Sequence, residues 1–349
     1  MRQWPMVAQK RQRTPVSESA KQSVAARGSR RGFDIYGLLS RYGTLIALLV
    51  LVAFNLAFTT NFATMQTLNV NLTQVCTIVI VAIGMTMVIA TGGIDLSVGS
   101  LMAISGALAP MIFMGKILPI GNIYVAVAVA MVVSIIVAGL LGVFNGWLVA
   151  RFRIQPIVAT LVLFIAGRGI AQVMTNGNLQ TFRVPEFQWI GLARPFGIPA
   201  QVIIMAVLVV IAAWAINRTT FGRNILAVGG NETASHLAGI PVSRVKLAVY
   251  AISGLCAGLA GLVVIAINSS SDANLVGLGM ELDAIAAVAV GGTLLSGGRA
   301  SIIGTLLGAL TIQLVRYTLL ANGVPDAAAL VVKAGIIAAA VWIQQNRTA

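Results

Sequence analysis

Apolar stretches of about 17 to 25 residues alternate with short polar segments along most of the chain, and helices of that length cross a bilayer. The alternation of apolar and polar residues that marks membrane β-strands is lacking. We therefore predict an all-α polytopic membrane protein with about ten transmembrane helices. The predicted spans are 43–60, 68–90, 97–115, 123–149, 156–175, 199–216, 245–268, 280–295, 301–321 and 327–343.

The segment 280–295 differs from the other nine. Its apolar part, Ala284 to Leu295, is short for a full crossing, and Glu281 and Asp283 precede it. It either spans the membrane or forms a re-entrant half-helix, and the second case would change the orientation of everything after it.

The composition agrees with a membrane protein. Hydrophobic residues make up 58% of the chain and charged residues 9%, well below the quarter that is usual in soluble domains. The net charge is +14, but most of the basic residues lie between the apolar spans and in the N-terminal segment. That distribution sets membrane topology, so we do not expect nucleic-acid binding.

The charges predict which side each polar segment faces. When the connections are assigned alternately to two sides, most basic residues fall on the side of 1–42 and five acidic residues fall on the other. By the positive-inside rule both termini are cytoplasmic, with 1–42 a disordered basic tail attracted to anionic lipid and 344–349 a short C-terminus. The basic residues of the inner connections are Arg151, Arg153, Arg218, Arg223, Arg244, Lys246, Arg299 and Arg347; the charged residues of the outer ones are Lys116, Arg183, Arg194, Glu186, Asp272, Glu281, Asp283 and Asp326.

Some polar residues lie inside or at the mouths of the spans. Arg168, Arg316 and Lys333 either extend toward the outer interface or line a polar translocation path. Polar amides that face lipid are costly, so we expect the amides to line a weakly binding cavity, with helix packing as their alternative role. These amides are Asn69, Asn71, Asn145 and Gln313.

One internal repeat is visible. Residues 91–101 (TGGIDLSVGSL) align without gaps to residues 296–306 (SGGRASIIGTL). Each copy follows one apolar span and opens the next, and both copies fall on the inner side. Two halves of like orientation are common in transporters.

The first copy has the residues of a tight turn. Gly92 and Gly93 permit backbone angles closed to other residues, and Asp95 or Ser97 can cap the following helix. A helix–turn–helix with no further role is the plainer interpretation. In the functional interpretation, residues of both copies form a turn that changes conformation during transport. These residues are Gly92, Gly93, Asp95, Gly297 and Gly298.

The long inner connection, 217–244, predicts a short amphipathic helix. Asn231 can cap it and Glu232 suits its first turn, where the helix dipole favours a carboxylate. Gly239 and Pro241 end it. Such a helix docks into a groove of a cytoplasmic partner or lies on the lipid surface. Its apolar stripe consists of Ala234, Leu237 and Ala238.

Catalytic chemistry is not indicated. The sequence has no Walker-type phosphate loop and no nucleophile paired with a base. His236 is the single histidine and has no second ligand nearby, so we predict no metal site. Cys76 and Cys256 both fall inside apolar spans as small hydrophobic residues.

Three motifs together resemble the permease subunits of bacterial ATP-driven sugar importers, the family of the ribose, xylose and arabinose permeases. They are TGGIDLSVG at 91–99, the FGR…AVGGN…A…GI loop at 221–240, and AVGGT at 289–293 with Gly297 and Gly298. The resemblance covers about residues 40–343.

This resemblance implies a fold like that of the vitamin B12 importer permease, in the inner membrane, with 43–343 as the permease domain. It also implies the partners: a second permease copy or paralogue, a cytoplasmic twin-domain ATPase that holds ATP and Mg, and an external sugar-binding protein. The helix at 231–240 becomes the coupling helix that enters the ATPase. The family often has Arg or Glu at the position of His236. The coupling residues implied are Asn231, Glu232, Ala234, His236, Gly239 and Ile240.

Two other classes remain in view. A self-sufficient ion-coupled transporter would place acidic relays inside its spans, and here no Asp or Glu lies within a clear span. A membrane enzyme or scaffold is the third interpretation. The sequence does not identify which sugar is carried, because the external binding protein is expected to select it.

The predicted topology can be tested by chemical labelling. Single cysteines placed near Arg183 and Asp272 should react with an impermeant reagent added outside, whereas one near Asn231 should not, because the charge distribution puts that loop inside. Labelling of the Asn231 position from outside would contradict the ten-span topology.

Overall fold

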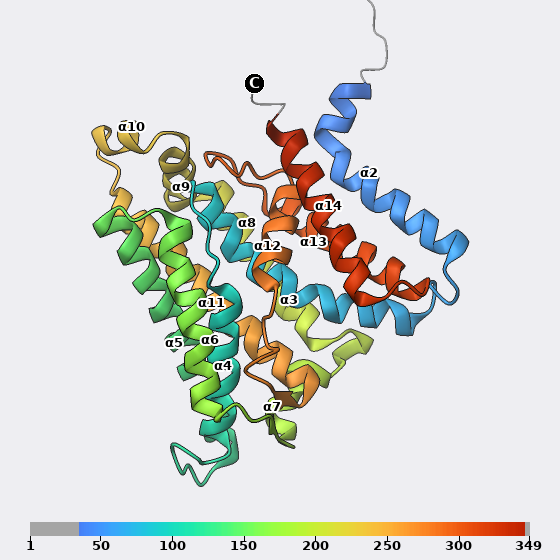
Figure 1. Cartoon of the computed structure of the whole chain (residues 1–349), viewed down its shortest axis with the longest axis vertical. Coiled ribbons are helices and arrows are strands. Elements are labelled where there is room, and N and C mark those ends of the chain that lie inside the picture. Colours follow the sequence, from blue (N-terminus) through green and yellow to red (C-terminus); the bar gives the residue numbers. More distant parts are fainter. Residues whose placement is uncertain (1–34, 346–349) are drawn as a thin grey trace, which may run out of the picture. The chain divides into compact units, whose positions relative to one another are not determined.

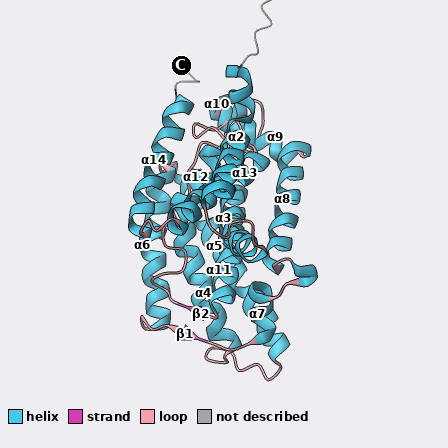
Figure 2. Cartoon of the chain, turned by 90° about the vertical axis from the view of Figure 1, so that its right-hand side faces the viewer, coloured by secondary structure: helices cyan, strands magenta, loops and turns pink. Residues whose placement is uncertain are grey.

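The computed structural model of the protein describes residues 35–345, which are almost entirely helical (Figures 1 and 2). The chain divides into units 1–43 and 44–349, and the packing described here is that of the second. Most of the predicted tail, and residues 346–349, lie outside the described residues, although α2 already begins at Ile35. The elements are α2 (Ile35–Phe58), α3 (Met65–Ala90), α4 (Val98–Phe113), α5 (Ile123–Phe152), α6 (Pro156–Thr175), β1 (Gln180–Thr181), α7 (Pro185–Leu192), the 3₁₀ turn η1 (Pro195–Gly197), α8 (Ala200–Arg218), α9 (Thr220–Gly230), α10 (Glu232–Leu237), α11 (Val242–Asn268), β2 (Ser270–Ser271), α12 (Met280–Val290), α13 (Ile302–Ala321) and α14 (Asp326–Gln345).

Six of the described helices are long and apolar enough to cross a membrane: α3, α5, α6, α8, α11 and α13. Shorter apolar stretches occupy Gly43–Phe58, Val98–Phe113 and Ala327–Ile336. All nine lie where the sequence predicts spans. The structure thus confirms a helical protein with several membrane-length helices, whereas the count of about ten crossings stays a prediction.

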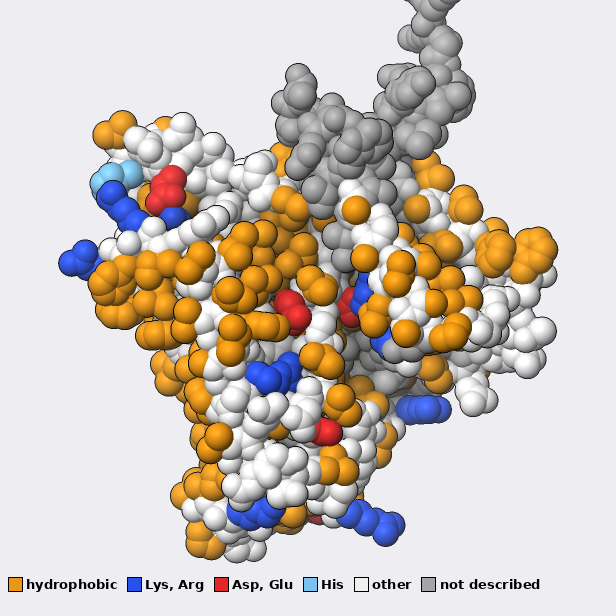
Figure 3. Space-filling model, viewed as in Figure 1, with side chains coloured by type: hydrophobic (Ala, Val, Ile, Leu, Met, Phe, Trp, Pro, Cys, Tyr) orange, Lys and Arg blue, Asp and Glu red, His pale blue; other side chains and the backbone are white. Residues whose placement is uncertain are grey.

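Helix α5 shows how such a helix divides its faces between lipid and protein. Val132, Ile136, Leu140 and Val143 recur at helical spacing and are all exposed. The opposite face is buried and made of small residues, which pack closely on α11. An exposed apolar face is costly in water and favourable in hydrocarbon. Figure 3 shows apolar side chains over much of the face in view. The small buried residues include Ala130, Ser134, Ala138, Gly139 and Gly142.

Helix α3 is the most buried of the six membrane-length helices. It contacts α8, α9, α11, α12 and α13. Helices α4, α5, α6 and α11 pack as one group, and α12, α13 and α14 as another (Figure 1). The strands β1 and β2 pair antiparallel near α7, at the end of the molecule opposite α10 (Figure 2).

The eighth predicted span is not one continuous helix. Helix α12 has 11 residues, about 16 Å at 1.5 Å per residue, against a hydrocarbon thickness of about 30 Å. The non-helical segment 272–279 precedes it. Arg168 of α6 holds this segment, because its Nη1 donates hydrogen bonds to the carbonyl oxygens of Ala273 (2.9 Å) and Val276 (2.6 Å).

The turns after α3 and α12 are built alike. Gly92 N–H donates to Ile89 O and Gly93 N–H to Val88 O; Gly292 and Thr293 repeat the pattern with Ala289 and Val288. Gly92 and Gly292 have φ of +80° and +81°. The structural counterpart of Gly92 is therefore Gly292, and not Gly297 as the gap-free alignment has it, because the connection before α13 is longer than the one before α4.

Candidate functional site

The connection 217–244, which is predicted to face the cytoplasm, forms two short helices with hydrogen-bonded ends. The Thr219 hydroxyl caps α9 by accepting from Gly222 N–H, and Asn231 Oδ1 caps α10 by accepting from Ala234 N–H at 2.9 Å. Gly239 ends α10 with φ +81°, and its N–H donates to His236 O. The local prediction of a capped helix that ends at a left-handed glycine is thus confirmed.

Helix α10 turns its apolar side outward. Leu237 is 83% exposed, and Ala234 and Ala238 are exposed as well, whereas Ser235 is buried. Ile240 packs partly against the core and anchors the end of the segment. A helix that buried its apolar stripe in its own chain would show the reverse arrangement, so α10 presents a surface suited to another partner.

One ion pair ties α10 to the next long helix. Lys246 Nζ of α11 lies 2.7 Å from Glu232 Oε2, in the first turn of α10. The carboxylate is also favoured there by the helix dipole. Exposed pairs of this kind contribute about 0–1 kcal/mol, so the pair orients α10 more than it stabilises the fold.

Three glycine pairs from distant segments meet beside α10. Gly298 N–H donates to Ala90 O at 3.0 Å, and a methyl group added at Gly229 would lie 1.8 Å from the same carbonyl oxygen. A methyl group at Gly297 would lie 2.8 Å from Gly92 N. We call this contact of the pairs 92–93, 229–230 and 297–298 the glycine junction. It brings the predicted turn residues Gly92, Gly297 and Gly298 together and joins them to the end of α9.

Asp95 binds a buried network instead of capping α4. It is fully buried and accepts from Ser97 N–H (3.0 Å) and Oγ (2.6 Å), and from Ser253 Oγ of α11 (2.8 Å). Burial raises the pKa of the Asp95 carboxyl, and the bonds from Ser97 and Ser253 oppose the rise. Ser97 makes no side-chain cap bond, so capping of α4 by Ser97 was wrong. The network connects the turn after α3 with α11.

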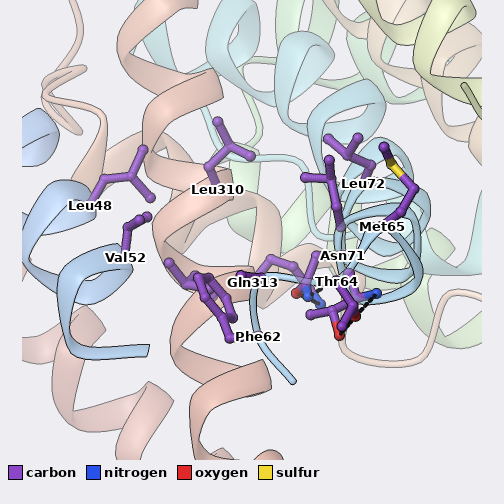
Figure 4. Close-up of a pocket in the computed structure, with 13 residues that line it drawn as sticks. Leu48, Val52, Phe62, Thr64, Met65, Asn71, Leu72, Leu310 and Gln313 are labelled. Carbon is purple, nitrogen blue, oxygen red and sulfur yellow. Dashed lines mark hydrogen bonds between the residues drawn. The ribbon is translucent and has the colours of Figure 1, made fainter. Parts of the chain in front are cut away.

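The four predicted path residues separate in space. Asn71 and Gln313 point toward one another in a largely apolar pocket of about 430 Å³ between α2, α3 and α13 (Figure 4). Gln313 Nε2 also donates to Gln74 Oε1. Gln74 lies in α3, as Asn71 does, but is not among the predicted path residues. Asn69 lines a different pocket beside α8. Asn145 is fully buried and donates to Ser97 Oγ at 2.8 Å, within the Asp95 network.

Arg168 and Lys333, both within predicted spans, bind partners in the protein. Arg168 pairs with backbone carbonyl groups, and Lys333 of α14 forms an ion pair with Asp283 in the first turn of α12. Arg316 lines a narrow space with Lys333 between α13 and α14. Both basic side chains thus reach into the segment 272–283, whose charged residues are predicted to face outward. Among the described residues, no group of three or more His, Cys, Asp or Glu side chains could hold a metal ion.

Comparison with known proteins gives a consistent result. The model of the family "Branched-chain amino acid transport system / permease component" matches residues 67–341. The ribose import permease RbsC of Escherichia coli K12 is 42% identical over 323 residues, which is 91% of this chain and 98% of that protein. The galactofuranose transporter permease YtfT of the same strain is 43% identical over 79% of each chain. The L-arabinose ABC transporter permease AraH of Azospirillum brasilense is 32% identical over 96% of this chain and 95% of that one. No solved structure matches the chain.

The glycine junction predicts unequal effects of two neighbouring substitutions. Gly229→Ala should lower the free energy of unfolding by about 1–3 kcal/mol, because the new methyl group must push α9 away from Ala90. Gly230→Ala should be neutral or stabilising, since nothing lies within 4 Å of its methyl group and alanine favours a helix. Thermal unfolding of the purified proteins in detergent measures both, and equal melting temperatures would contradict the packing.

Proposed function

Because this chain belongs to the permease family of ATP-binding-cassette importers that includes ribose, galactofuranose and arabinose permeases, we propose that it moves a monosaccharide across the inner membrane. It is a transport subunit and not an enzyme. The family model carries a branched-chain amino acid description, but the relatives cited are named for sugars. Their names support a sugar as the cargo.

The exposed apolar side of α10 is the main observation that supports a coupling mechanism. We propose that it docks into a cleft of a separate cytoplasmic ATPase, which holds ATP and Mg and drives transport. The cap at Asn231, the ion pair of Glu232 and the left-handed Gly239 make α10 a rigid element. A rigid docking helix loses little conformational entropy on binding and can transmit a displacement. His236 and Ile240 flank the same surface.

The proposed assembly follows the family. Two permease copies or paralogues would form the membrane part, with an external binding protein that delivers the sugar. The end with β1 and β2 would face outside and the end with α10 would face the cytoplasm, with both termini on that side. We propose about ten membrane segments arranged as in the vitamin B12 importer, with the 272–279 segment and α12 together forming the eighth.

Substitutions in α10 test the coupling. Gly239→Leu forces a left-handed angle on a residue with a Cβ, and Glu232→Lys removes the pair with Lys246 and opposes the helix dipole. A misfit of 1.4 kcal/mol at a docking surface corresponds to tenfold in affinity. We therefore expect retention of the ATPase, sugar uptake, or both to fall by about tenfold or more. Pull-down of the complex and stimulated ATP hydrolysis in vesicles measure this.

Gly323→Leu is the matched control for backbone strain. Gly323 also has φ +81°, has nothing within 4 Å of an added methyl group, and ends α13 with the same hydrogen-bond pattern. It should cost similar strain and leave ATPase retention unchanged. If the Gly239 and Glu232 variants retain the ATPase, hydrolyse ATP and transport like the parent, α10 is not the coupling element.

A further inference from the structure

A second pocket, of about 270 Å³, lies where the early part of α3 meets the start of α8 and the end of α11. Its walls combine apolar groups with several uncharged polar side chains and one arginine. We call it the Gln201 pocket. It is lined by Asn69, Val70, Thr73, Gln74, Gly191, Leu192, Arg194, Pro199, Gln201 and Ile267.

Gln201 lines this pocket and has a buried acceptor without a partner. The residue is 1% exposed, and its Nε2 donates to Thr73 Oγ1 at 3.1 Å. Its Oε1 has no hydrogen-bond partner among the described residues. A buried carbonyl oxygen without a donor is costly and rare in folded proteins, so its presence beside a pocket points to a donor that the chain itself does not supply.

The other polar side chains of the pocket suit an uncharged ligand. Asn69 is 93% buried and Gln74 already accepts from Gln313, so both are held in place. Amide side chains both donate and accept, as sugar hydroxyl groups do. Leu192, Pro199 and Ile267 supply the apolar walls against which the C–H face of a sugar ring packs. Small-molecule sites usually combine a few placed polar groups with apolar walls in this way.

We propose that the Gln201 pocket is a contact site for the transported sugar, in which the groups that now cover Gln201 Oε1 move aside and a sugar hydroxyl donates to this oxygen. This inference rests on the proposed function and adds the residues that touch the cargo. The pocket includes Arg194 and the start of α8, which lie on the side predicted to face outward, so an incoming sugar reaches it before the inner turns. Weak binding there lets the sugar leave again.

A lipid phosphate is the competing occupant, and the chemistry disfavours it. Arg194 would attract a phosphodiester, but that group carries only acceptor oxygens and leaves Gln201 Oε1 without a donor. A sugar brings several O–H donors. Bilayers of phosphatidylcholine, whose headgroup has neither N–H nor O–H groups, therefore give the cleanest background for a test.

The test measures binding of D-ribose, L-arabinose and D-galactose to the purified permease in phosphatidylcholine nanodiscs by saturation-transfer NMR. For a bound sugar, Gln201→Leu should weaken the signal by about fivefold, as expected for loss of one neutral hydrogen bond. Gln180→Leu is the matched control. Gln180 is also buried, and its Nε2 donates to Ala107 O. Its Oε1 likewise has no partner among the described residues. Unlike Gln201, it lines neither this pocket nor the pocket of Figure 4.

Melting temperatures first establish that both variants are folded. Each outcome of the binding measurement then supports or overturns the Gln201 pocket as a sugar contact site. An unchanged signal for Gln180→Leu with a weakened one for Gln201→Leu supports the site. Equal losses, or no sugar signal from the parent, overturn it. Loss of the sugar signal on adding phosphatidylglycerol would assign the pocket to lipid and overturn it too. The proposed function is tested separately, by sugar uptake through the complete importer. Uptake by the parent that is lost in the Gly239→Leu variant supports the function, and absence of uptake by the parent refutes it.

Discussion

Inside a bilayer, a backbone N–H or C=O group that leaves a helix has no water to pair with, and each unpaired group costs several kcal/mol. A membrane protein with a broken helix must therefore supply partners from elsewhere in the chain. Arg168 does so for the segment before α12, where two carbonyl oxygens accept from its guanidinium. At the end of α3, Gly298 N–H pairs with Ala90 O. Both bonds join elements far apart in sequence, so pairing the backbone also sets the tertiary arrangement.

The glycine junction follows from the same constraint. Backbone groups of three segments can pair and pack only if no side chain stands between them, and a methyl group at Gly229 or Gly297 would intrude on neighbouring backbone atoms. The close approach places the end of α9 directly on the turns that end α3 and precede α13, and α10 begins two residues later in the chain. Glycine at these positions thus serves contact between chain segments as well as turn geometry.

Local signals were sufficient for some features and insufficient for others. The apolar runs located nine helical segments, and Asn231, Gly239 and Pro241 defined α10, because caps and span lengths depend only on neighbouring residues. The partners of Arg168 and Asn145 could not be predicted, since they lie on other helices. The gap-free repeat paired Gly92 with Gly297 because sequence identity does not reveal that one connection is longer. The acceptor of Gln201 is similarly invisible in sequence, because a glutamine at the start of a helix is usually solvated.

Two helices that border the Gln201 pocket also extend to the glycine junction or to α10. Helix α3 lines the pocket with residues 69–74 and ends in the glycine junction, whereas α11 lines it with Ile267 and is tied to α10 at its other end by Lys246. Between these ends, Ser253 binds α11 to Asp95 in the turn after α3. Packed helices move as units because interiors are dense and resist local deformation. In the proposed mechanism, a displacement of α10 that moves α11 relative to α3 would change the width of the pocket between them, and this change would connect ATP hydrolysis by the partner mechanically to the sugar.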